Sequence, residues 1–227
     1  MDKTAIRDAS TIIIVRDRHE NPSVLMGQRG SKAAFMPNKF VFPGGAMDLA
    51  DADVPLASPI PSPCYDRLIE DSVSDHRTGL VAAAIRELWE ETGLILGETG
   101  TWPNAAPQDW QSYADQGFLP SGRTLQFVFR AITPPGRPRR FDARFFLADA
   151  AHIQNDKDDF SGACDELSHL QWIPLSKARS FDLPFITEVV LAEVASTITQ
   201  DAPPKSVPFF RNDDEDSLFL RLRGTGR

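Results

Sequence analysis

Short runs of apolar residues, separated by polar turns, recur along the chain and predict a β-sheet. Segments 10–16 and 23–29 are rich in isoleucine, valine and leucine, and a polar Arg-His-Glu-Asn-Pro turn separates them. This arrangement predicts a hairpin. Further runs with strand character lie at 40–42, 125–132, 141–148, 167–173 and 218–222.

Helical spacing of apolar residues appears in two longer segments. In segment 80–94 apolar residues recur three and four positions apart, and Gly93 is a residue that commonly ends a helix. A second helix is expected to start at Pro184 and to carry an apolar face. Shorter helices are predicted at 108–116 and after Ser176, which can cap a helix. Strands interspersed with helices predict the α/β class.

Segment 52–78 has a different composition from the segments around it. It contains four prolines among serines and then an acidic stretch. We therefore expect a surface insertion, partly ordered at best, within a single domain that spans residues 1–227. Residues 203–227 are expected to form a proline-rich, acidic tail, with a last strand at 218–222.

Composition and charge exclude several classes of partner. The chain of 227 residues has a formal net charge of −8, which favours neither a nucleic acid polymer nor an anionic membrane. Cys64 and Cys164 lie far apart in the sequence, and reduced thiols in a cytoplasmic protein are the simplest interpretation. We expect neither a signal peptide nor a membrane span, because the apolar run near the start is only strand-length. The oligomeric state stays open, and a homodimer is one alternative.

Three carboxylates lie on one face of the predicted helix 80–94. Glu87, Glu90 and Glu91 are three and four positions apart, so their side chains are neighbours. Such carboxylates repel one another unless a positive charge lies between them. Mg²⁺ takes oxygen ligands and commonly joins carboxylates to substrate phosphates. Two interpretations follow, a helix that holds a metal ion or a solvated acidic face.

The sequence from Arg86 to Leu94, Arg-Glu-Leu-Trp-Glu-Glu-Thr-Gly-Leu, resembles the signature of the Nudix hydrolases. In that family a glycine, five residues and a glutamate come first, and seven further residues lead to the arginine. Here Gly45 and five residues lead to Asp51, a shorter carboxylate than the family's glutamate. Since 34 residues (52–85) separate Asp51 from Arg86 instead of seven, about 27 are inserted. The insertion coincides with segment 52–78, and loops tolerate such length because closure entropy grows slowly.

This resemblance implies an α/β/α sandwich with a mixed sheet, a Nudix helix and an insertion within the signature. It also implies a hydrolase in which water attacks the phosphorus of a diphosphate linked to another group, with Mg²⁺ or Mn²⁺ as cofactor. Glu87, Glu90 and Glu91 are the expected metal ligands, with the carbonyl of Gly45 as a further donor. Arg86 is expected to brace the carboxylates through Glu90 or Asp51.

Other residues are candidates for the general base and for substrate binding. Glu166, or its neighbour Asp165, lies where relatives place a mobile carboxylate, and a solvated loop carboxylate is the alternative. Arg29 and Arg140 could bind an anionic ligand, although surface arginines that offset an acidic protein are the alternative for the cluster around Arg140. Phe35 could stack on a base or pack in the core. Gly44 completes the substrate-binding candidates.

The interrupted signature resembles a subgroup typified by an animal peroxisomal coenzyme A diphosphatase. Similar stretches continue through Phe-Asp-Ala-Arg-Phe-Phe (141–146) and Glu-Leu-Ser-His-Leu-Gln-Trp (166–172). Coenzyme A or acyl-coenzyme A is thus the leading substrate, cleaved to 3′,5′-ADP and a 4′-phosphopantetheine. The alternatives are an ADP-ribose, dinucleotide or nucleotide-sugar pyrophosphatase and, in another class, a Nudix-fold module that binds a nucleotide without cleaving it. The intact Glu87/Glu90/Glu91 set argues against the binding module.

Overall fold

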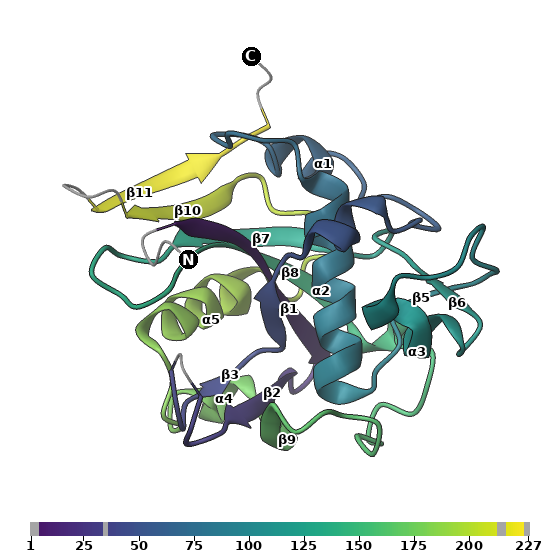
Figure 1. Cartoon of the computed structure of the whole chain (residues 1–227). Helices are drawn as coiled ribbons and strands as arrows, with labels where there is room; N and C mark the ends of the chain where they lie inside the picture. Colours follow the sequence, from purple (N-terminus) through teal and green to yellow (C-terminus); the bar gives the residue numbers. More distant parts are fainter. Residues whose placement is uncertain (1–4, 34–35, 213–216, 225–227) are drawn as a thin grey trace.

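The computed structural model describes residues 5–33, 36–212 and 217–224. Among these residues, nine strands form one mixed sheet in the order β11-β10-β7-β8-β1-β2-β3, with β4 paired to β1 and β9 paired to β2 (Figure 1). The pairs β1/β8 and β10/β7 are parallel, and the remaining pairs are antiparallel. The strands are β1 (Ile6–Arg16), β2 (Ser23–Arg29), β3 (Phe40–Val41), β4 (Gly44–Ala46), β7 (Gln126–Ile132), β8 (Arg140–Asp149), β9 (Leu167–Pro174), β10 (Val207–Asn212) and β11 (Ser217–Leu222).

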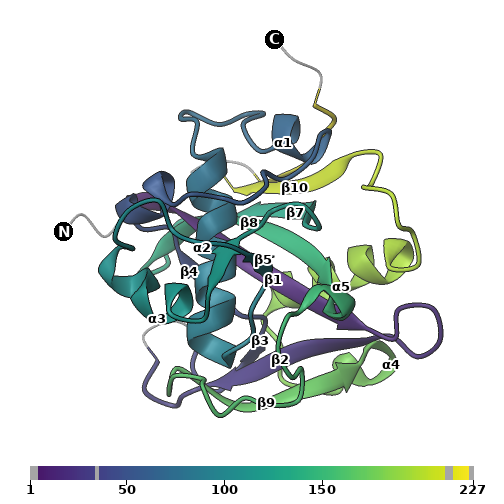
Figure 2. The same cartoon turned by 90° about the vertical axis from the view of Figure 1, so that its right-hand side faces the viewer.

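Helices cover both faces of the sheet, as Figure 2 shows for α2 (Arg77–Thr92) and α5 (Phe185–Thr197). The central strand β1 explains this arrangement, because it is apolar on both sides, as expected of a strand buried between two layers. Ile12 and Ile14 pack in the core under α2, whereas Ile13 and Val15 pack in the core under α5. The predicted α/β/α sandwich with a mixed sheet is therefore confirmed.

Most predicted elements are present with shifted ends. The hairpin of β1 and β2 forms as expected, and Gly93 ends α2 in the left-handed conformation at φ 73°. The predicted short helix at 108–116 is present as η2 (Gln108–Trp110) followed by α3 (Gln111–Ala114). Ser176 is not a helix cap, because α4 (Leu175–Ala178) already begins after Pro174. A two-stranded sheet of β5 (Gly97–Thr99) and β6 (Phe118–Pro120) was not predicted.

The expectation that segment 52–78 is at best partly ordered is wrong. The segment contains α1 (Cys64–Arg67), and its last two residues belong to α2. Its apolar side chains enter the core beneath α2, where Val54, Ile60, Cys64 and Leu68 are at most 3% exposed. Proline and serine in this segment therefore shape a packed connection and do not leave it unstructured.

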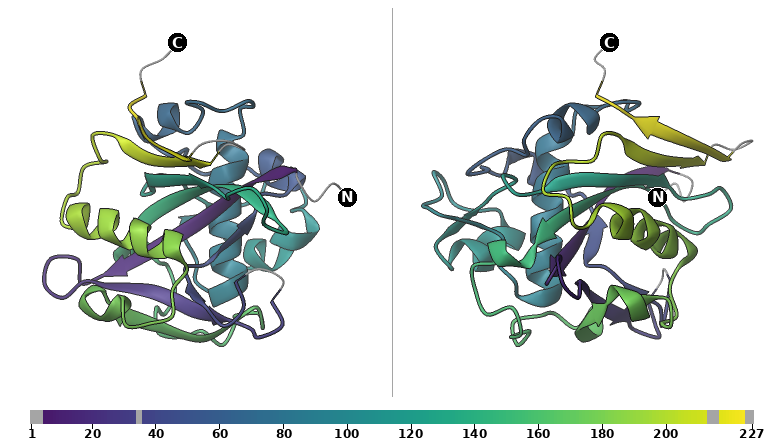
Figure 3. Two further views of the ribbon diagram at one scale, coloured as in Figure 1. Left: turned by 90° about the vertical axis from the view of Figure 1, so that its left-hand side faces the viewer. Right: turned by 180° about the vertical axis from the view of Figure 1, so that it is seen from behind.

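Buried arginines fasten this insertion to the sheet and to the chain's last strands. Arg130 of β7 donates to the carbonyls of Glu70 and Asp71 at 2.8 and 3.1 Å, and Arg67 donates to the carbonyl of Lys205 at 2.9 Å. Residues predicted as a tail thus form β10 and β11, which lie beside the insertion in Figure 3. Segment 52–78 and the predicted tail, both expected to be peripheral, therefore pack together and are joined by hydrogen bonds.

Two further expectations concern membranes and cysteines. Within the described ranges, no helix combines the length and apolar character needed to cross a membrane. Cys64 is buried, Cys164 is exposed, and both thiols are free, as the sequence predicted.

Candidate active site

Two of the three glutamates of α2, Glu87 and Glu91, are buried. Glu87 is 8% exposed and Glu91 is 1% exposed, because β4 and η1 (Leu49–Asp53) cover the helix on that side. Solvation is the usual reason that acidic residues gather on one helix face. That interpretation is wrong for Glu87 and Glu91.

The turn before β4 brings main-chain atoms against these carboxylates. The amide of Gly44 donates to Glu91 Oε2 at 2.8 Å. At Gly45 a β-carbon would lie 2.3 Å from Glu87 Oε1, so only glycine permits this approach. Gly44 and Gly45 of β4 therefore bring the backbone into contact with the acidic pair.

Burial makes the ionised forms of Glu87 and Glu91 unfavourable in free energy. Burial raises the pKa of Glu87 to about 7, and Glu90 adds to the shift, although the Arg86 guanidinium opposes it. The pKa of Glu91 also lies well above its usual range, first because of burial and then because of the neighbouring Glu87. Glu91 Oε1 is buried and has no hydrogen-bond partner. The charge of Arg29 lowers the pKa of Glu91 again, but it does not outweigh the effects of burial and of Glu87.

Arg86 joins the two halves of the interrupted signature. Its Nε donates to Asp51 Oδ1 at 3.0 Å, and its Nη1 donates to Glu87 Oε1 at 2.9 Å and to Glu90 Oε2 at 3.0 Å. Its Nη2 donates to the carbonyl of Ala46 at 3.0 Å. Despite burial, these acceptors, Asp51 first, hold the pKa of Arg86 above its usual range. Arg86 thus contacts the acidic side chains it was expected to brace.

Comparison with known proteins relates this arrangement to a family. A solved structure of a Nudix hydrolase from Alicyclobacillus acidocaldarius is 26% identical in sequence, with a TM-score of 0.63 over 87% of this chain and 95% of that one. The chain has the Nudix fold. The curated Caenorhabditis elegans protein "Putative nudix hydrolase 7" is 29% identical over 179 residues. That alignment covers 74% of this chain and 51% of the relative, so the chain spans about half the length of this curated relative. No family model matches the sequence. Together these two similarities support a relationship between this chain and the Nudix hydrolase family.

The Nudix helix α2 does not place its three glutamates alike. Glu87 and Glu91 lie towards the glycine turn, whereas Glu90 is half-buried and paired with Arg86. Among the described residues, no three acidic, histidine or cysteine side chains meet as a ready-made metal-binding group.

Arg29 and Glu166 lie at the edge of the same site. Arg29 Nη2 donates to Glu166 Oε1 at 2.7 Å, and this pair joins β2 to the residue that precedes β9. Both side chains are close enough to influence the pKa of Glu91, Glu166 raising it and Arg29 lowering it. Four of the predicted residues from distant segments, Arg29, Glu87, Glu91 and Glu166, are therefore brought together.

Arg140, a predicted substrate-binding residue, lies apart from this cluster along the sheet. Arg140 begins β8 opposite Ile6, four residues along β1 from the position opposite Gly45, a separation of about 13 Å. Its guanidinium donates to the carbonyls of Thr133 and Asn212 at 3.0 and 3.1 Å. Arg140 thus holds the connection that follows β7 and the end of β10 at these carbonyls, and its assignment to substrate binding stays a prediction. Phe35 lies outside the described residues.

Trp110 belongs to the site's surroundings and was not anticipated. Its indole Nε1 donates to Asp51 Oδ1 at 3.0 Å across 59 positions of sequence. A tryptophan in a predicted short helix gives no sign of such a contact, because the pairing depends on the tertiary fold.

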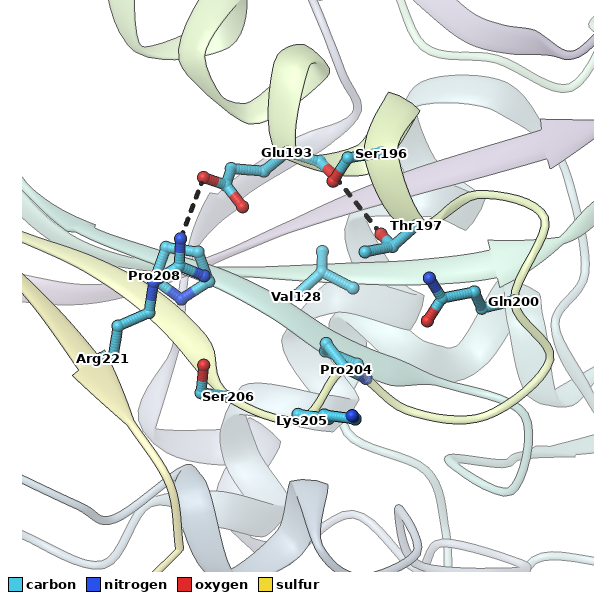
Figure 4. Close-up of a pocket in the computed structure, with 10 residues that line it drawn as sticks. All are labelled: Val128, Glu193, Ser196, Thr197, Gln200, Pro204, Lys205, Ser206, Pro208 and Arg221. Carbon is cyan, nitrogen blue, oxygen red and sulfur yellow. Dashed lines mark hydrogen bonds and ion pairs between the residues drawn. The ribbon is translucent and has the colours of Figure 1, made fainter.

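A separate hollow of about 340 Å³ lies between α5 and the β10/β11 hairpin (Figure 4). An ion pair between Glu193 and Arg221, at 3.4 Å, spans part of it. Lys205 and Thr197 also line it, and none of the acidic site's residues does. This hollow is distinct from the candidate active site.

The close approach at Gly45 makes a direct prediction. We expect Gly45→Ala to weaken Mn²⁺ binding at least about tenfold, because the new methyl group must displace the Glu87 carboxylate from its contact. Calorimetric Mn²⁺ titration of the purified protein measures this. Gly30→Ala is the matched control, since a β-carbon at Gly30 meets nothing within 4 Å. Equal affinity in both variants would show that Glu87 does not hold the ion.

The raised pKa of Glu87 predicts how stability depends on pH without metal. Between pH 4.5 and about 7 the unfolded chain loses this proton before the folded one does, so the free energy of unfolding falls as pH rises. The loss from this group is complete above about pH 7 and reaches roughly 3 kcal/mol. Urea unfolding in EDTA across this range measures it. Glu87→Gln should lose less stability over the same interval, and an identical decline in both proteins would contradict the assignment.

Proposed function

We propose that the chain is a divalent-metal-dependent Nudix hydrolase that cleaves a diphosphate bond in a nucleoside-diphosphate-linked substrate. The observation that carries the proposal is the buried pair Glu87 and Glu91, one helical turn apart, facing the Gly44-Gly45 turn. Two buried carboxylates with an unpartnered oxygen and raised pKa values have little structural use by themselves. A cation bound between them would offset the unfavourable free energy of burying two carboxylates side by side.

The donor set suits a hard cation such as Mg²⁺ or Mn²⁺, which prefers carboxylate and carbonyl oxygens. Glu87 and Glu91 would hold it together with the carbonyl of Gly45, and Glu90 lies at the edge of the set. When bound, the ion supplies charge neutralisation at the phosphate oxygens and lowers the pKa of an attached water. Arg86 keeps Glu87 and Glu90 oriented through its bonds to both.

The pair Arg29 and Glu166 supplies two further functions, phosphate binding by the arginine and general-base catalysis by the glutamate. A guanidinium binds phosphate oxygens well, so Arg29 is placed to take a substrate phosphate. Glu166 is 52% exposed at its side chain and would then lose its partner. The freed carboxylate accepts the proton of the attacking water as general base. Substrate binding and release of the base are thereby linked through one ion pair.

Replacing Glu166 tests this role against its neighbour. We expect Glu166→Gln to lower kcat about 10²-fold, because the amide cannot accept the proton. Asp165→Asn is the matched control and should retain activity within about twofold. Steady-state kinetics on whichever substrate is hydrolysed measures both. The opposite ranking would assign the base to Asp165.

Coenzyme A or an acyl derivative is the substrate we propose, with 3′,5′-ADP and a 4′-phosphopantetheine as products. The support is the interrupted signature, in which about 27 additional residues separate Asp51 from Arg86. In the fold these residues form a packed segment against β7 and α2, and the two halves of the signature still meet through Arg86. ADP-ribose, dinucleotides and nucleotide sugars are the alternative substrates.

A hydrolysis panel distinguishes these possibilities. Coenzyme A, acetyl-coenzyme A, ADP-ribose, a diadenosine polyphosphate and a nucleotide sugar are each incubated with Mg²⁺ or Mn²⁺, and products are identified by mass. We expect coenzyme A or its acyl form to be cleaved fastest. Faster cleavage of another member would reassign the substrate within the same reaction. Tight binding without turnover of any member would identify a binding module.

A further inference from the structure

Trp110 occupies a buried position next to the proposed metal site without reaching it. Its side chain is 1% exposed. Its ring lies edge-on to Tyr113, with the centroids 5.4 Å apart, and 5.7 Å from Trp102. Packing of this kind fixes the indole, so the direction of its N–H is also fixed.

The acceptor of that N–H is the carboxylate of Asp51, which is itself 1% exposed. Asp51 Oδ1 receives Trp110 Nε1 and Arg86 Nε, each at 3.0 Å. Asp51 Oδ2 receives the amide of Asp48 at 2.9 Å and Arg86 Nη2 at 3.1 Å. Arg86 Nε also lies 3.4 Å from Oδ2, so each oxygen has at least two donors, and the carboxylate is held by Trp110, Arg86 and the amide of Asp48.

Asp51 affects the orientation of Glu87 through Arg86, which bonds to both carboxylates. One edge of the guanidinium lies on Asp51, and its remaining nitrogen, Nη1, donates to Glu87 and Glu90. Because a guanidinium is planar and rigid, rotating one edge displaces the other. The order of contacts runs from Trp110 to Asp51, then to Arg86 and then to Glu87.

We propose that Trp110 is a positioning residue for the metal site, acting through Asp51 and Arg86 on the orientation of Glu87. The inference rests on the proposed function, since Glu87 matters for metal binding only if the site holds one. It assigns a role to the connecting region between β5 and β6, which supplies Trp110.

Trp102 shows that packing alone does not require this contact. It is a half-buried neighbour with the same N–H group, and that group donates to a main-chain carbonyl, Phe118 O, at 2.9 Å. A buried indole needs an acceptor, and a neutral carbonyl is sufficient. Trp110 instead donates to a buried charge, where a hydrogen bond is stronger and affects the orientation of a charged group.

The test compares Trp110→Phe with Trp102→Phe, which remove one indole N–H each and keep an aromatic ring. Mn²⁺ alone is titrated into each protein without substrate, and unfolding is measured in parallel. We expect Trp110→Phe to weaken Mn²⁺ binding about three- to tenfold and to lower kcat with KM nearly unchanged. Trp102→Phe should destabilise the protein comparably and keep Mn²⁺ affinity within about twofold.

Two other outcomes would contradict the positioning role of Trp110. Unchanged Mn²⁺ affinity in Trp110→Phe, or an equal loss in both variants, would overturn the positioning role while leaving the proposed function intact. No Mn²⁺ binding by the wild-type protein would overturn the proposed function and this inference with it.

A second measurement covers the case in which Trp110→Phe fails to fold. The indole N–H signals of the ¹⁵N-labelled wild-type protein are followed by NMR while Mg²⁺ is added. We expect the Trp110 signal to shift and the Trp102 signal to stay in place. A Trp110 signal that does not respond to bound Mg²⁺ would refute the inference.

Discussion

Glu91→Gln is expected to abolish hydrolysis, with a fall in kcat of about 10³-fold or more, while the protein remains folded. The amide keeps the size of the side chain and its oxygen can still accept the Gly44 N–H. It cannot supply a negative charge to a bound cation, and charge stabilisation by a metal ion is worth several kcal/mol in the transition state.

The stability of this variant distinguishes a site residue from a structural one. Glu91 is buried beside another carboxylate, and the pKa of its carboxyl is raised, so removing its charge should stabilise the metal-free fold. We expect an equal or higher unfolding temperature in EDTA, together with loss of the stabilisation that Mn²⁺ gives the wild-type protein. Glu188→Gln, at an exposed position of α5, is the control and should behave like wild type. Wild-type turnover by Glu91→Gln would eliminate the metal assignment.

Arg86→Gln is expected to destabilise the protein by about 3–5 kcal/mol, because it leaves buried carboxylates without their counter-charge. Asp51 is 1% exposed and Glu87 is 8% exposed, and both now bond to the guanidinium. Denaturant unfolding at pH 7.5 measures the loss. The part of the deficit that comes from Glu87 should shrink towards lower pH, because burial raises the pKa of this carboxyl and protonation removes its charge.

The exposed pair of Arg221 and Glu193 provides the comparison for that loss. Its side chains are 44% and 29% exposed, so Arg221→Gln should cost less than about 1 kcal/mol. Adding Glu87→Gln to Arg86→Gln should recover part of the lost stability, since one unpaired charge is removed. A cost for Arg86→Gln no greater than that for Arg221→Gln would show that the buried network does not depend on the arginine.

Local patterns were sufficient to predict the parts of the fold that depend on near neighbours in sequence. The apolar run of β1 indicates a strand, and its burial on both faces follows from its being apolar at every position. Gly93 ends α2 because a left-handed residue is needed there. Counting five residues from Gly45 located Asp51, and the structure places Asp51 against Arg86.

The features that sequence patterns missed depend on contacts between distant segments. The prolines of 52–78 suggested a loose surface segment, but buried Ile60 and Cys64 anchor it, and the arginines that hold it come from β7 and β8. The spacing of the three glutamates did not show that Glu87 and Glu91 are buried while Glu90 is half-buried, because that difference depends on how η1 and β4 pack on α2. A single sequence does not show which acceptor each arginine meets, so the carbonyl partner of Arg140 and the carboxylate partner of Arg29 could not be assigned in advance.

The contact between the insertion and the last strands has a consequence for synthesis on the ribosome. Arg67 is 4% exposed, and a carbonyl that it bonds belongs to Lys205. While residues near 205 are still inside the exit tunnel, the Arg67 guanidinium lacks this hydrogen-bond acceptor and its segment cannot close over the core. Stalled nascent chains that end before residue 200 should therefore be cut by protease within 57–75, and full-length released chains should resist. The segment that covers the outer side of α2 thus becomes fully packed only after the residues near 205 are available.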